Sequence, residues 1–182
     1  MSNHPMIDPA RVPIYRSAFI KSIRRCLVDD AVYWGSVLYR LGHAKSVWHR
    51  ILIHCSEDVG IAEPNLPANI RALYNNFNTL VQLGQHESSI IVYTHAIILL
   101  ASAQKSRIVD NAVICYYREP LEARPIPDYA FDHHTREGRQ AGRDINYFIE
   151  ESSKLENDNL HDPYEQRAKE ILLRSIEKKN AT

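Results

Sequence analysis

The spacing of the apolar residues limits this chain to a helical fold. Between residues 14 and 118 apolar side chains recur every three or four positions, and only 6 glycines occur in 182 residues. This period places side chains on one face of an α-helix, whereas a half-buried strand would alternate every second residue. The sequence therefore predicts an all-α fold, with helices over residues 14–25, 30–41, 45–58, 67–83, 87–103 and 105–118.

Polar and glycine residues mark the ends of several predicted helices. Asp29 or Asp30 is a suitable N-cap for the second helix, because a short carboxylate can accept hydrogen bonds from free N–H groups of the first turn. Gly42 and Gly84 follow the second and fourth helices, where glycine readily adopts the left-handed conformation that ends a helix. The fifth stretch is apolar almost all round, which is typical of a helix packed on several sides.

The composition divides the chain into three parts. Residues 1–13 contain Pro5, Pro9 and Pro13 and are expected to form an extended arm before a helical domain over 14–119. Residues 120–182 begin with three prolines in "PLEARPIPDYAF", so this segment is expected to be less regular. It should end in a helix over about 163–179 and pack on the same domain.

Charge and cysteine content exclude several classes of protein. Lys plus Arg and Asp plus Glu both number 22, so no overall positive field attracts DNA or a membrane surface. Three separated cysteines indicate reduced thiols in a cytoplasmic protein, and the start lacks a signal-peptide pattern. The most apolar run, residues 90–103, is shorter than the roughly 20 residues that span a bilayer, so no membrane partner is expected.

Motifs for common cofactors and reactions are missing from the sequence. It contains no GxxxxGK[ST] phosphate loop, and no GxGxxG, HExxH or GxSxG. The chain is therefore expected to bind no cofactor, to hydrolyse no nucleotide on its own and not to be an enzyme.

The densest group of metal-binding residue types is Asp132, His133 and His134. Adjacent histidines point in different directions on a helix, whereas ligand pairs usually lie three or four residues apart. His49 and His54, five apart, fit no better. We therefore expect no metal site.

Two adjacent acids, Glu57 and Asp58, end the third predicted helix in "HCSEDVG". Acids in a last turn oppose the helix dipole, at a cost of roughly 0.3–1 kcal/mol each when exposed, so cationic partners should offset them. The candidate partners, and thus structural polar anchors, are Lys21, Arg24 and Lys105. A catalytic role for the acids, or for the His133–His134 region, stays open as an alternative; it requires these side chains to converge in a pocket.

A basic row follows in the C-terminal third. Arg136, Arg139 and Arg143 are three and four residues apart, so a helix would align their guanidinium groups on one face. Such a row suits phosphate recognition, and hence DNA, but also ion pairing within the chain or between subunits. The sequence leaves both interpretations open.

Three stretches in register resemble one family. They are "SAFIKSIR" leading into "DDAVYW", then "SEDVG" followed by Pro64, and "AQKS" after the apolar fifth helix. Over about residues 17–117, their order and spacing resemble the C-terminal region of the RarA/MgsA-type replication-associated recombination ATPases, a clamp-loader-like branch of the AAA+ proteins.

The resemblance implies a helical collar domain that holds such proteins together as tetramers acting on DNA at stalled replication forks. The preceding ATPase domain has no counterpart before Ser17, and "DHHTREGRQAGRDINYFIEESSKLEN" departs from the expected tail. We therefore expect a non-enzymatic oligomerisation module related to DNA replication, recombination and repair. It would act as a homo-oligomer or with a separately encoded AAA+ ATPase, and DNA binding through the arginine row is the alternative.

Overall fold

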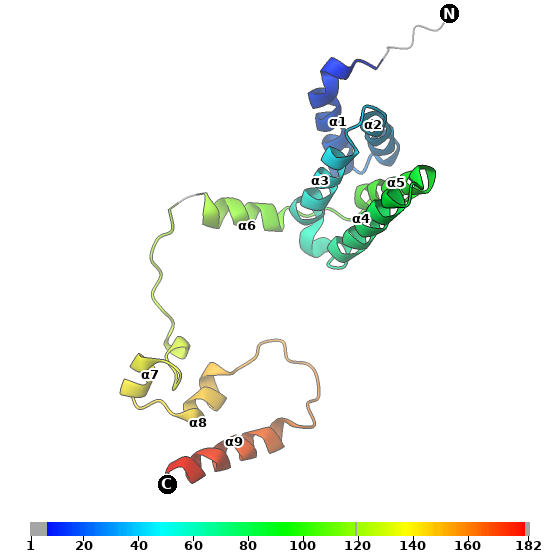
Figure 1. The fold of residues 1–182 in the computed structure, drawn as a ribbon. Coiled ribbons are helices and arrows are strands. Elements are labelled where there is room, and N and C mark those ends of the chain that lie inside the picture. The colour runs from blue at the N-terminus through cyan, green and yellow to red at the C-terminus, as the bar shows by residue number, and fades with distance from the viewer. Residues whose placement is uncertain (1–6, 119, 181–182) are drawn as a thin grey trace, which may run out of the picture. The chain divides into compact units, whose positions relative to one another are not determined.

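The structure is a computed structural model that describes residues 7–118 and 120–180, with side chains as far as Arg174. It divides into two compact units, Met1–Leu121 and Glu122–Thr182. Every regular element of the described residues is helical (Figure 1), so the predicted all-α fold is confirmed. Residues 1–6 of the expected arm lie outside the described part. The segment just before the first helix forms a single 3-10 turn, Pro9–Arg11.

The first unit holds helices α1 to α6 in the predicted order. Their bounds are α1 Val12–Arg24, α2 Val28–Arg40, α3 Ala44–His54, α4 Leu66–Gln82, α5 His86–Ser102 and α6 Ile108–Tyr117. Two short turns follow α3, a π-helical turn Cys55–Val59 and a 3-10 turn Gly60–Ala62. The third predicted helix thus changes geometry after His54, and the sixth begins three residues later than predicted.

An aromatic cluster forms the centre of this unit. The Trp48 ring of α3 lies 5.3 Å from that of Phe77 in α4 and 6.0 Å from that of Tyr93 in α5. α2 approaches α5 closely at Gly35, where an added Cβ would lie 2.5 Å from Cδ1 of Ile97. Burial of this cluster removes large apolar surfaces from water, which is the main favourable contribution to folding.

The predicted helix ends are confirmed at the glycines and wrong at the aspartates. Gly42 and Gly84 follow α2 and α4 with φ of +80° and +73°, a conformation that costs glycine little. Asp29 and Asp30 are not N-caps, because Leu27 holds that position and both acids lie in the first turn. There they still favour the helix electrostatically.

The second unit is built mainly from short elements. They are a 3-10 turn Asp128–Ala130, α7 Arg136–Gln140, α8 Ile145–Tyr147, a π-helical turn Phe148–Ser152 and the longer α9 Glu165–Asn180. Residues 120–127 form no regular structure, as their prolines predict. Among the described residues, no apolar side chain of this unit is buried. That residues 120–182 pack on the helical domain stays a prediction.

No helix in the described part of the chain is both long enough and apolar enough to cross a lipid bilayer.

A hydrogen bond between Tyr93 of α5 and Gly35 of α2 links two packed helices, and a substitution by phenylalanine removes it while keeping the aromatic ring. The buried Tyr93 hydroxyl donates to the Gly35 carbonyl at 2.9 Å. We expect Tyr93→Phe to lower the free energy of unfolding by about 1 kcal/mol, the usual net value of such a bond. Urea denaturation measures this change. Tyr33→Phe is the control, because Tyr33 is half exposed and should give almost no change; equal effects of the two substitutions would contradict the assignment.

Candidate functional site

The π-helical turn after α3 carries the two acids that the sequence singled out. Gly60 follows it with φ of +50°, and a Cβ there would lie 2.9 Å from Cγ2 of Val109 in α6. The Asp58 carbonyl accepts a hydrogen bond from the Ser106 N–H at 2.8 Å. The turn is therefore fixed against the connection between α5 and α6, and "SEDVG" meets "AQKS" in space.

Arg24, in the last turn of α1, bridges both acids. Its Nε lies 2.9 and 3.0 Å from the two carboxylate oxygens of Asp58, and its Nη2 lies 2.6 Å from Oε1 of Glu57. The Asp58 side chain is 2% exposed and that of Arg24 33% exposed. A carboxylate this deeply buried requires charged or hydrogen-bonding partners, because desolvation of an unpaired charge is costly.

Arg107 is a second cation in this site and was not among the partners predicted from the sequence. Its Nη1 lies 3.2 Å from Oδ1 of Asp58, and its Nη2 lies 3.5 Å from Oε1 of Glu57. It also pairs with Asp110 one turn into α6. The Asp110 contact raises the pKa of Arg107 further, so the guanidinium stays charged. The only signal in the sequence was the i,i+3 spacing of Arg107 and Asp110.

His54 is the third positively chargeable group beside the acids. Its Nδ1 lies 2.7 Å from Oδ2 of Asp58 and 3.2 Å from Oε2 of Glu57. Neither nitrogen of the ring has an aligned hydrogen-bond partner, so these contacts are electrostatic. Burial lowers the pKa of His54 despite the two carboxylates, and Arg24 adds to that shift. We refer to Arg24, His54, Glu57, Asp58 and Arg107 as the ion cluster.

The two lysines that the sequence proposed as partners lie elsewhere. Lys21 is exposed on α1, and the described residues include no ion pair between it and either acid. Lys105 donates from Nζ to the carbonyls of Leu100, Ala101 and Ala103 at 2.6–3.1 Å. It thus caps the C-terminal end of α5, where free carbonyls and the helix dipole favour a cation.

The arginine row in the second unit is not one helical face. α7 ends at Gln140, and Gly142, with φ of +73°, reverses the chain before Arg143. Arg139 donates to the His133 and His134 carbonyls at 3.0 Å. Arg143 donates to the Asp128 and Phe131 carbonyls, pairs with the Asp128 carboxylate, and lies over the Tyr147 ring. Arg136 is exposed.

The reason given for excluding a metal at Asp132, His133 and His134 is also wrong. These residues lie in a turn before α7, not on a helix, so the helical separation of adjacent side chains does not apply. Their ligand atoms fall within 4.8 Å of one another, as do those of His54, Glu57 and Asp58. These are the two groups of the described residues that could hold a metal ion.

The ion cluster has the character of a structural site. Both carboxylates face two guanidinium groups, which contact Oε1 of Glu57 and both oxygens of Asp58. It ties the end of α1, the turn after α3 and the start of α6 together in a domain whose helices surround one aromatic core. These features define an all-α helical domain stabilised at one end by a buried ion cluster.

The sequence matches the family described as MgsA AAA+ ATPase C terminal over residues 26–170. The chain belongs to this family, and the resemblance to RarA/MgsA-type proteins is confirmed.

Named relatives agree with this assignment. The chain is 33% identical over 121 residues to replication-associated recombination protein A of Haemophilus influenzae, covering 66% of this chain and 26% of the relative. It is 31% identical over 137 residues to the Bacillus subtilis protein of the same name, and this match covers 72% of this chain and 31% of the relative. An AAA domain-containing protein of Mycobacterium tuberculosis is 33% identical over 98 residues, and this match covers 53% of this chain and 21% of that protein. The chain thus spans less than a third of each relative's length.

Removal of Arg24 should destabilise the first unit. We expect Arg24→Ala to lower the free energy of unfolding by about 2–3 kcal/mol, because the buried charge of Asp58 then loses one of its cationic partners. This value lies below the roughly 3–5 kcal/mol for breaking a fully buried ion pair, since Arg24 is partly exposed. Urea denaturation provides the measurement. Lys21→Ala, on the same helix, should change stability by less than about 0.5 kcal/mol. A larger loss from Lys21→Ala than from Arg24→Ala would show that the cluster is assigned wrongly.

The lowered pKa of His54 makes stability depend on pH. The folded chain binds a proton at His54 less readily than the unfolded chain does, so the stability contributed above pH ~6.5 is lost as pH falls below that value. We expect His54→Gln to make this acid-side loss shallower in urea denaturation between about pH 7.5 and 5. His49→Gln, at an exposed position of α3, should keep the wild-type slope. An unchanged slope in His54→Gln would mean that another group is responsible.

Proposed function

We propose that this chain is a non-enzymatic helical oligomerisation domain of an AAA+ system that acts in DNA replication and recombination. Its membership of the C-terminal family of MgsA-type AAA+ ATPases and the names of its relatives support the link to replication and recombination. The observation that carries the oligomeric role is the exposed apolar surface of α6.

α6 has the composition of a buried helix without the burial. Its sequence, IVDNAVICYY, is apolar on every side, yet none of its residues, all of which the structure describes, is buried. Tyr117 is 83% exposed, and Val113 and Ile114 are about two-fifths exposed. The helix extends from the bundle of α1 to α5 (Figure 1) and contacts the turns after α3. A helix that is apolar all round is normally covered on several sides, so another protein surface is expected to cover it.

α5 exposes a second apolar strip in the same unit. Ile91 and Ile98, two helical turns apart, lie on one exposed face and are 72% and 42% exposed, with His95 between them. The opposite face of α5 packs into the aromatic core through Tyr93 and Ile97. Two sources of uncovered apolar surface in one unit support an interface larger than one helix could provide.

The state of the ion cluster supports a non-enzymatic role. Glu57 and Asp58 are both ion-paired with Arg24 and Arg107, an arrangement that suits structural rather than catalytic acids. The cluster also fixes the start of α6, which carries the proposed interface. By this proposal the ion cluster is a structural anchor for the oligomer, and the subunit number that the family resemblance implies is four.

Charged substitutions on α6 should dissociate the oligomer. We expect the wild-type chain to form a multimer at micromolar concentration, and Ile114→Glu with Tyr117→Glu to give a monomer, because carboxylates in the interface would be desolvated without partners. Size-exclusion chromatography with light scattering measures the mass. Circular dichroism should show unchanged helicity, since neither side chain is buried within the chain.

The matched control is Ile14→Glu, which places the same charge on an exposed apolar position of α1. It should leave the multimer intact. A monomeric wild-type chain, or a double variant with the wild-type mass, would contradict the proposed role of α6.

A homo-oligomer and an assembly with a separately encoded AAA+ ATPase are both compatible with such an interface. DNA binding through Arg136, Arg139 and Arg143 stays the alternative. Arg139 and Arg143 already use donors within the chain, so the exposed Arg136 is the residue of the three best placed for a phosphate contact.

A further inference from the structure

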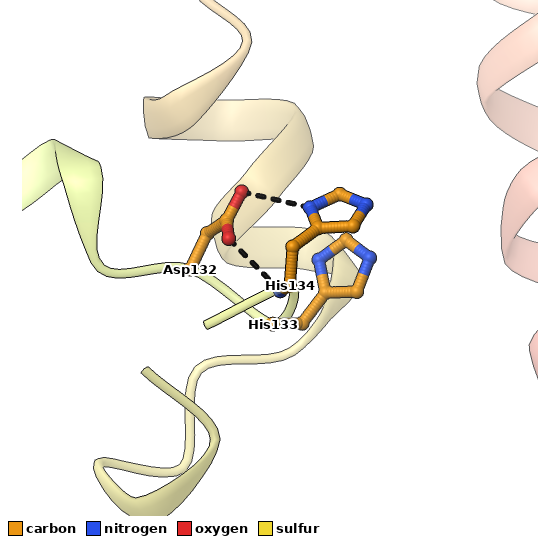
Figure 2. A group of neighbouring side chains, drawn as sticks. All are labelled: Asp132, His133 and His134. Atoms are coloured by element: carbon orange, nitrogen blue, oxygen red, sulfur yellow. Dashed lines mark hydrogen bonds and ion pairs between the residues drawn. The ribbon is translucent and has the colours of Figure 1, made fainter. Parts of the chain in front are cut away.

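Asp132, His133 and His134 bring three metal-ligand side chains together in one turn. Figure 2 shows the Asp132 carboxylate beside the His134 ring, and the His133 ring close to that of His134 and tilted from it by 40°. Oδ2 of Asp132 lies 3.0 Å from Nδ1 of His134, and one ligand atom from each residue falls within a 4.8 Å group. Zinc bonds to nitrogen and oxygen are about 2.0–2.2 Å, so displacements under about 1 Å would close the three ligands around one ion.

His133 has an unsatisfied nitrogen at this place. Its Nδ1 is buried and has no hydrogen-bond partner, which is uncommon for a buried polar atom and costs free energy. The His133 and His134 ring centroids lie 3.8 Å apart, and both rings contact the edge or face of Phe148. The two imidazoles are thus held next to each other beside the Asp132 carboxylate.

The backbone around these ligands is held by several independent contacts. Oδ1 of Asp132 accepts the His134 N–H at 2.9 Å, and the Thr135 hydroxyl caps α7 by accepting the Gly138 N–H at 3.0 Å. Arg139 donates to the carbonyls of both histidines. The Asp132 carbonyl packs so closely on Gly138 that an added Cβ would lie 1.9 Å from it. The ligands therefore stand on a preorganised loop, which lowers the cost of binding an ion.

The second unit also needs a source of stability. Among its described residues no apolar side chain is buried, and only Asp132 and Gly138 are. Segments of this size obtain only a few kcal/mol from an apolar core, and a disulfide or a structural metal often adds to their stability. Cysteines occur only at positions 26, 55 and 115, so residues 122–182 have none with which to form a disulfide. A metal ion at the central turn would supply the missing stabilisation.

The other group of this kind, His54, Glu57 and Asp58, differs in a decisive way. Arg24 and Arg107 contact both oxygens of Asp58 and one oxygen of Glu57, and their charges would repel a cation. At Asp132 the described residues place no arginine or lysine in an ion pair with the carboxylate. The same residue types thus form an ion-pair site in the first unit and an available ligand set in the second.

We propose that Asp132, His133 and His134 bind a divalent transition metal ion, zinc in the first instance, that stabilises the fold of residues 122–182. Two imidazoles and one carboxylate are a donor set that zinc accepts, and water completes the coordination. The ion would bind Oδ2 of Asp132 and Nδ1 of His134, and the buried Nδ1 of His133 would gain a partner. The inference is independent of the proposed oligomeric role.

The test measures zinc binding and protection of the second unit. Because exposed Cys26 and Cys115 could also bind zinc, the whole chain carries Cys26→Ser and Cys115→Ser and is first freed of metal with a chelator. Calorimetric titration with zinc at about pH 7.5 should give one site per chain, and hydrogen exchange within residues 128–152 should slow on binding. Asp132→Asn, His133→Asn and His134→Asn should each weaken zinc binding at least tenfold and abolish the change in exchange.

Two features of the design separate a lost ligand from a lost fold. Asparagine at 132 can still accept the His134 N–H, so Asp132→Asn should exchange like the metal-free parent while losing zinc. His161→Asn, an exposed histidine of the same unit, should keep the affinity of the parent chain. Absence of zinc binding in the parent chain overturns the proposal. So does binding by the three ligand variants that is as tight as that of the parent, or a loss of affinity in His161→Asn as large as the loss in the ligand variants.

Discussion

The buried carboxylate of Asp58 is the interaction on which the arrangement of the first unit depends. It is 2% exposed, and its charge is offset by guanidinium groups from two segments far apart in sequence, Arg24 and Arg107. Its backbone carbonyl is used as well, by Ser106. One residue thus joins the end of α1, the turn after α3 and the connection into α6. Because a buried charge without partners is strongly unfavourable, these three segments adopt one arrangement.

The π-helical turn explains how two adjacent acids can face the same cations. In a regular helix neighbouring side chains point about 100° apart, which would direct Glu57 and Asp58 to different surroundings. The turn Cys55–Val59 widens the helix at this place, and Arg24 reaches both carboxylates. Such widened turns occur often at functional sites, and here the function is to hold a junction.

Local patterns predicted the helices, whereas the site depended on contacts distant in sequence. The apolar period and the glycines at 42 and 84 placed α1 to α5 closely, because these signals act within a few residues. Charge alone could not distinguish Lys21 from Arg24, nor reveal Arg107, which lies about 50 residues from the acids. The arginine row failed for a different reason: its spacing requires a continuous helix, and Gly142 ends that possibility before Arg143.

The two units differ in what holds them together, and this has a thermodynamic consequence. The heat capacity and the denaturant dependence of unfolding both scale with the surface that unfolding exposes. None of the apolar side chains described in residues 122–182 is fully buried, so unfolding of this unit would contribute less to either quantity than unfolding of the first unit. A calorimetric or urea transition would then report mainly on α1 to α5. Unfolding of the second unit would change these signals little, so spectroscopic probes on its own residues are needed to follow it.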